Sequence, residues 1–247
     1  MESSNPMLSR MAKATGLRAP GATMTVAGTA WKTLVLLGLV CFGAAFTWQA
    51  VAAGNVGIVM PALLVGGIGG FVLALVTVFR PQLAPFTAPL YAVVEGLLLG
   101  AISALYDARY AGLPRTAVVL TLATAGGMYL LYATGVIRAT PMFRKIVVGA
   151  TLGIVLASLV ALVARLFGAQ LPFLWDSSPL GIGLSVVIVG VAALNLVLDF
   201  DFIERGVEYG APRYMEWYGA FGLLVTLVWL YLEMLRLLAK LQGRSRA

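Results

Sequence analysis

The 247-residue chain contains no histidine and a single cysteine, Cys41. These absences exclude a disulfide within the chain, a zinc site built from cysteine and histidine, and a Ser-His or Cys-His catalytic pair. Histidine is also the side chain that normally titrates near neutral pH. Any pH response must therefore come from carboxyl groups that hold a proton near neutral pH.

Charge is also scarce. Only 11% of the residues are charged and 61% are hydrophobic, whereas a soluble domain has about 25% charged and about 45–50% apolar residues. This composition predicts an integral membrane protein whose spans pack against one another in lipid. The formal net charge is +7, but no basic patch is interleaved with aromatic residues, so we expect the bilayer and not nucleic acid as the partner.

Seven apolar runs follow a polar and basic N-terminal stretch. Each is close to the roughly 20 residues that a helix needs to cross a bilayer, and lipid requires helices because it cannot satisfy exposed backbone groups. We predict an all-α bundle with a cytoplasmic tail over 1–30, a membrane domain over 31–241 and a short basic tail over 242–247. The runs cover about residues 31–54, 56–79, 86–106, 115–137, 145–168, 180–203 and 217–240.

Orientation follows from the basic residues. With seven spans, ten of the 17 Lys and Arg residues fall on the side of the N-terminus and seven on the other. Because Lys and Arg concentrate in cytoplasmic loops, we expect the N-terminus to be cytoplasmic. No retention or transit signal is evident, so the expected location is a bacterial inner membrane.

In the run GGIGG at 66–70, Gly66 and Gly70 are four residues apart. This spacing of small residues is typical of membrane helices that approach one another closely. The run is not a phosphate-binding loop, because no Lys-Ser or Lys-Thr follows it. The chain carries neither a nucleophile elbow nor a nucleotide loop, and the aspartates lack the glycine motifs of intramembrane proteases. We expect no enzymatic activity and no cofactor.

Ionisable residues inside spans are rare, because each costs about 2.5–3.5 kcal/mol at the helix centre, and they tend to mark function. Glu95 lies at the centre of the third run. It is either a neutral structural acid or a proton or cation site. Asp199 lies in the last third of the sixth run, and Asp201 is about 200° further around the helix. We expect Asp199 to point inward and Asp201 to face the mouth, beside a solvated loop from Glu204.

Glu233 lies in the seventh run, and Arg236 follows three residues later on the same helical face. Either the two form an ion pair near the outer interface, or Glu233 meets a carboxylate on another helix. Two buried carboxylates that meet share a proton, because they cannot both ionise easily. Such a pair latches two helices when protonated and offers hard oxygen ligands to Ca²⁺ when ionised. The residues alone do not identify which carboxylates meet.

Three motifs resemble those of one family. LVLDFDFI at 196–203 resembles the sixth-span motif of the Bax inhibitor/YccA (transmembrane Bax inhibitor motif) family, with Asp199 followed four residues later by Ile203. WLYLEMLRLLAKL at 229–241 resembles the family's closing helix, and VVEGLLLGAIS at 93–103 resembles its Glu-Gly-Leu segment. The resemblance implies a helical bundle around a central seventh helix.

The family includes pH-sensitive calcium leak channels, in which aspartates of the sixth and seventh spans form a proton-sharing latch. Carried over, these positions become Asp199 and Glu233. At position 233 this chain has Glu where the family has Asp. The number of residues between Asp199 and Glu233 is also larger than is usual in the family, and the extra residues fall in the 204–216 loop. If that loop does not absorb them, Glu233 misses Asp199.

These observations predict a passive, pH-gated leak for Ca²⁺, with Asp199, Glu233 and Glu95 at the gate or ion path. Asp199 and Glu233 are the expected Ca²⁺ ligands, and Asp201 and Arg236 support them. One alternative is a proton-coupled transporter, although no internal repeat is evident. Another is a non-conducting protein that modulates membrane-protein partners, in keeping with the family's association with stress and cell survival.

Overall fold

The computed structural model describes residues 23–167 and 178–244. Within these ranges the regular elements are helices, apart from one isolated bridge between Thr23 and Pro212. Seven crossings among the described residues are long and apolar enough to span a membrane. The chain is therefore an integral membrane protein of the predicted all-α class.

The first crossing is α2 (Val26–Ala52). The second follows the short η1 (Val56–Ile58) and has three parts, which are α3 (Val59–Leu64), the π-helical η2 (Val65–Gly69) and α4 (Gly70–Phe79). The third is α5 (Ala84–Arg109), preceded by η3 (Pro81–Leu83). The other four are α6 (Leu113–Ala133), α7 (Pro141–Leu166), α9 (Pro179–Glu208) and α10 (Met215–Arg244).

Several helices extend beyond the predicted limits. The side chain of Thr25 caps α2, so this helix begins within the stretch expected to be a tail. α9 continues to Glu208 and ends at a turn in which Gly210 has a φ of 61°, a conformation that favours glycine. The expected solvated loop over 204–216 is thus reduced to residues 209–214. At the other end, α10 runs to Arg244, past the predicted start of the C-terminal tail.

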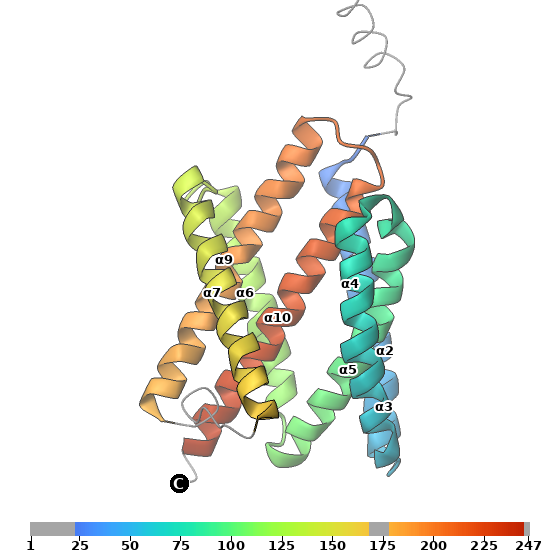
Figure 1. Ribbon diagram of the computed structural model, residues 1–247. Coiled ribbons are helices and arrows are strands. Elements are labelled where there is room, and N and C mark those ends of the chain that lie inside the picture. Colours follow the sequence, from blue (N-terminus) through green and yellow to red (C-terminus); the bar gives the residue numbers. More distant parts are fainter. Residues whose placement is uncertain (1–22, 168–177, 245–247) are drawn as a thin grey trace, which may run out of the picture.

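The last helix occupies the centre of the bundle. Figure 1 shows α10 running obliquely between one group formed by α6, α7 and α9 and another formed by α2, α3, α4 and α5. In α5 and α10, 56% of the most apolar stretch is buried, whereas the other crossings bury at most 33%. This arrangement confirms the prediction of a bundle around a central C-terminal helix.

Glycines of the second crossing allow it to approach α5 closely. A Cβ at Gly66 would overlap the side chain of Leu98, and one at Gly70 would lie 2.7 Å from Oε2 of Glu95. The predicted role of this glycine pair in close helix packing is therefore confirmed. At Gly70 the same feature also makes room for a carboxyl group.

Candidate functional site

Asp199 joins α9 to the central helix. The hydroxyl of Thr226 on α10 donates a hydrogen bond of 2.6 Å to Oδ2 of Asp199. One turn before Thr226, a Cβ added at Gly222 would lie 3.6 Å from Oδ1. The carboxyl group of Asp199 is therefore seated on a small-residue face of α10, with a single hydroxyl as its side-chain partner there.

Asp201 faces a different neighbour. Its carboxylate accepts hydrogen bonds from Arg144 on α7 at 2.5 Å and from Arg205 on α9 at 3.0 Å. The two aspartates thus point to different helices, as the 100° rotation per residue predicted. Asp201 is not a solvated residue at a mouth, because its side chain is only 14% exposed and paired with both arginines.

Glu233 forms an ion pair within its own helix. Arg236 donates from Nη1 to both carboxylate oxygens of Glu233, at 2.7 and 2.9 Å. Thr226, the partner of Asp199, lies seven residues before Glu233, which is about 10 Å of helical rise. The structure therefore does not bring Asp199 and Glu233 together, and a Ca²⁺ site made of these two carboxylates is not assembled.

The physical reason is the length of the connection between α9 and α10. Both helices continue into the segment that was expected to be a loop, so only six residues join them. This short connection brings Thr226 to the level of Asp199 and leaves Glu233 two turns beyond. The hydroxyl of Thr226 thus stands where the resemblance predicted a second carboxylate. The departure in spacing was the sequence signal for this outcome.

Glu95 lies on the opposite flank of the central helix. Its side chain is buried near Gly70, immediately after the π-helical segment η2, and such segments often occur at functional sites. The neighbouring Tyr91 packs edge-on against Phe221 of α10, with ring centroids 5.1 Å apart.

Glu95 and Asp199 lie at similar depth on either side of α10. Glu95 and Thr226 are each eleven residues from the first residue of their helix, or about 16 Å of rise. The hydrocarbon core of a bilayer is about 30 Å thick, and both carboxyl groups lie within crossings that are long and apolar enough to span it. On α10, Phe221 packs against Tyr91 of α5, the helix that carries Glu95, while the adjacent Gly222 faces Asp199 of α9.

A cavity of about 620 Å³ lies between α2, α6, α9 and α10. It is lined by Thr29 and Thr33 and by Glu204, which accepts a hydrogen bond from the hydroxyl of Tyr132. It also reaches Phe200 and Leu223, the sequence neighbours of Asp199 and Gly222. A mostly apolar cavity with a few polar groups therefore reaches the contact between α9 and α10 at the end of the bundle where α2 begins.

A buried ion-pair cluster at this end was not found by sequence reasoning. Glu216 in the first turn of α10 is 3% exposed and is paired with Lys32 of α2. The backbone N–H and the hydroxyl of Thr25 donate to it at 3.0 and 2.9 Å, and the Lys32 ammonium lies 5.5 Å from the Trp217 ring centroid. The available signal was an acidic residue in the first turn of a helix.

The comparisons agree with the three motifs. A family model described as Bax inhibitor 1 like matches residues 5–243. The chain belongs to this family. Comparisons with curated proteins and with solved structures find no match. Among the described residues of this Bax inhibitor 1 like protein, no group of three or more Cys, Asp or Glu side chains is placed to hold a metal ion.

Proposed function

We propose that this Bax inhibitor 1 like protein is a pH-sensitive cation leak channel, with Ca²⁺ as the favoured ion. The observation that carries the proposal is an ionisable carboxyl group within a membrane-spanning helix, tied to the central helix through the hydroxyl of Thr226. Intramembrane carboxyl groups commonly mark ion or proton paths. The choice of Ca²⁺ rests on the family resemblance and on the preference of this ion for oxygen ligands.

The gate in this proposal uses Asp199 without a second carboxylate. A protonated Asp199 is neutral, so it stays between α9 and α10 in hydrogen-bond contact with Thr226. Ionisation makes that position costly, because a charge within a span is disfavoured, by up to about 2.5–3.5 kcal/mol at its centre. The ionised carboxylate therefore favours a state in which water enters between the helices and a cation can approach. The leak rises with increasing pH.

Glu95 supplies a second proton or cation site along the path. It is buried on the other flank of α10, where a Cβ at Gly70 would lie 2.7 Å from its Oε2. In contrast, Glu233 and Asp201 are already neutralised by arginines. We therefore assign the pH gate to Asp199, a cation site on the path to Glu95, and structural ion pairs to Glu233–Arg236 and to Asp201.

The test is Ca²⁺ flux into proteoliposomes at acidic and at mildly alkaline pH. Asp199→Asn should abolish the pH dependence, because the amide does not ionise. Glu208→Gln is the matched control, since this exposed carboxylate lies on the same helix near its end. Equal flux in empty and protein-containing liposomes would refute the leak. A pH dependence that survives Asp199→Asn would refute the gate.

The buried carboxyl groups also favour a proton-coupled transporter as the second candidate. Uphill solute accumulation driven by a proton gradient would establish it. A protein that acts only through membrane-protein partners would instead keep its cellular activity when Asp199 and Glu95 are both neutralised. We propose an inner-membrane location with the N-terminus cytoplasmic, supported by Lys32, Arg144 and Lys145 at the end where α2 begins. No enzymatic activity or cofactor is proposed.

A further inference from the structure

A lateral groove lies between α2 and α6. α2 packs mainly on α5 and α10, whereas α6 packs mainly on α10 and α9. Two cavities, of about 310 and 250 Å³, follow one another between α2 and α6, and α5 and α10 supply the rest of their lining. Four residues line both cavities, namely Ala44, Ser103, Val118 and Tyr231. The two cavities are therefore parts of one groove.

The groove opens toward the bilayer and has the depth of one leaflet. Cys41 on α2 and Leu122 on α6 line it and are exposed, whereas Leu224 of the central helix lines it and is fully buried. Along α2 the groove runs from Leu37 to Trp48, which is about 16 Å of helical rise. This length is close to half of a hydrocarbon core of about 30 Å.

The polar groups of the groove lie toward one end. Arg115, in the first turn of α6, and Trp48, near the end of α2, line the outer cavity. Further in, the hydroxyls of Ser103 and Tyr231 lie 2.6 Å apart. One O–H proton forms this hydrogen bond, and the second can be donated to an oxygen of a ligand. Beyond this hydroxyl pair, most of the lining side chains are aliphatic.

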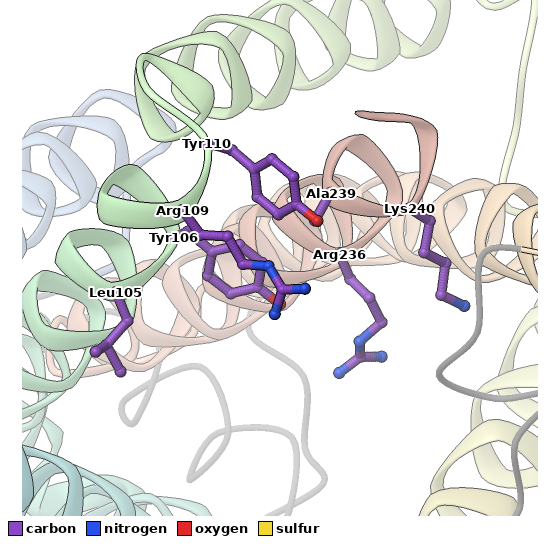
Figure 2. Close-up of a pocket in the computed structure, with 7 residues that line it drawn as sticks. All are labelled: Leu105, Tyr106, Arg109, Tyr110, Arg236, Ala239 and Lys240. Carbon is purple, nitrogen blue, oxygen red and sulfur yellow. The ribbon is translucent and has the colours of Figure 1, made fainter. Parts of the chain in front are cut away.

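A basic cavity of about 380 Å³ at the same end of the bundle has its polar contacts within the protein. Figure 2 shows Arg109, Arg236 and Lys240 around it. Arg109 lies 5.7 Å from the ring centroid of Tyr110, Arg236 is paired with Glu233, and Lys240 donates to a backbone carbonyl oxygen of α9 at 2.9 Å. Because these cations already have partners in the protein, we expect a ligand at this end of the bundle in the groove.

We propose that the groove between α2 and α6 binds one acyl chain of a membrane phospholipid, with the phosphate of that lipid at Arg115. A guanidinium group matches phosphate oxygens through paired N–H donors, and tryptophan is common at the level of lipid headgroups. The hydroxyl pair of Ser103 and Tyr231 lies deeper, where the ester carbonyls of the lipid follow its phosphate. The aliphatic part then receives the acyl chain, whose burial is favourable.

The order of groups along the groove thus matches the order of groups in a phospholipid, from phosphate to ester to hydrocarbon. A ligand between helices of a bundle, in a mostly apolar site with a few placed polar groups, also fits the usual character of such sites. The proposal does not depend on the cation leak.

The experiment uses the full-length protein in a mild detergent, with phosphatidylcholine added. Native mass spectrometry counts the lipid molecules that stay bound as detergent is increased. Val118→Trp fills the groove where its two cavities meet and should abolish retention of the last bound lipid. Val119→Trp is the matched control, because this neighbouring position is exposed and lines neither cavity. It should retain the lipid as the wild type does.

A second pair of variants avoids any effect of a bulky side chain on folding. Arg115→Gln should weaken retention about two- to fivefold, as expected for an exposed charge pair. Arg80→Gln removes an exposed arginine at the opposite end of the bundle and should leave retention unchanged. Cys41, the only cysteine of the chain, reports the location of the lipid. Bound phosphatidylcholine should slow its alkylation by a small maleimide in the wild type and not in Val118→Trp.

Three results would overturn the proposal. Equal retention in Val118→Trp and Val119→Trp would show that the lipid does not occupy the groove. Alkylation of Cys41 at the same rate with and without phosphatidylcholine would lead to the same conclusion. Retention of palmitate as strong as that of phosphatidylcholine, and insensitive to Arg115→Gln, would identify a fatty-acid site in place of a phospholipid site.

Discussion

Replacement of Thr226 by Val removes the hydroxyl that contacts Asp199 and keeps a β-branched side chain on the central helix. In the structure this hydroxyl lies 2.6 Å from Oδ2 of Asp199. A valine leaves the carboxyl group against α10 without this partner. In an open state water solvates the carboxyl group, so the substitution raises the free energy of the closed state selectively.

The expected magnitude follows from the charge of Asp199. A hydrogen bond to a charged group contributes about 1.5–3 kcal/mol, and one between neutral groups about 0.5–1.5 kcal/mol. At about 1.4 kcal/mol per tenfold change, Thr226→Val should raise the ratio of open to closed states by about 12- to 140-fold when Asp199 is ionised. When Asp199 is protonated, the corresponding increase should be about 2- to 12-fold.

The assay is the initial rate of Ca²⁺ entry into proteoliposomes of equal protein content, at acidic and at mildly alkaline pH. Thr226→Ser retains the hydroxyl and should restore the wild-type rate. Thr121→Val is a matched control, because the hydroxyl of Thr121 donates only to the carbonyl oxygen of Ala117 in its own helix. The control should leave the rate unchanged.

A rate for Thr226→Val equal to that of the wild type at both pH values would refute the proposed latch. A lower rate would also contradict it, because loss of the contact cannot stabilise the closed state in this scheme. Correct folding of each variant is established first by its elution as a single species in detergent.

Three further predictions concern other contacts. Glu233→Gln should leave the pH dependence of Ca²⁺ flux unchanged, because this side chain is not in contact with the gate, and a flattened profile would reinstate it as a gating residue. Gly100→Ala should lower the free energy of unfolding in SDS by about 1–3 kcal/mol through overpacking against α2, whereas Gly38→Ala, which meets no atom within 4 Å, should not. Lys32→Gln should lower the free energy of unfolding in SDS by about 3 kcal/mol, because Glu216 would remain buried without its cation. An unchanged unfolding curve would contradict this prediction.

Helical periodicity predicted the relative directions of Asp199 and Asp201, since residues two positions apart on a helix differ by about 200°. It also placed Glu233 and Arg236 on one face, and the ion pair between them is a local consequence. The partners of Asp199 and Glu216 could not be obtained in this way. Each depends on which turn of one helix lies beside which turn of another.

The sequence by itself determined a membrane protein with seven helical crossings, because lipid requires long apolar helices whose backbone groups are internally satisfied. It also identified the few carboxyl groups that are costly in a bilayer. Only the tertiary structure decided how these groups are paired. The register between α9 and α10 is set by helix ends and a six-residue connection, and a shift of two turns replaced the expected Glu233 by Thr226 as the partner of Asp199.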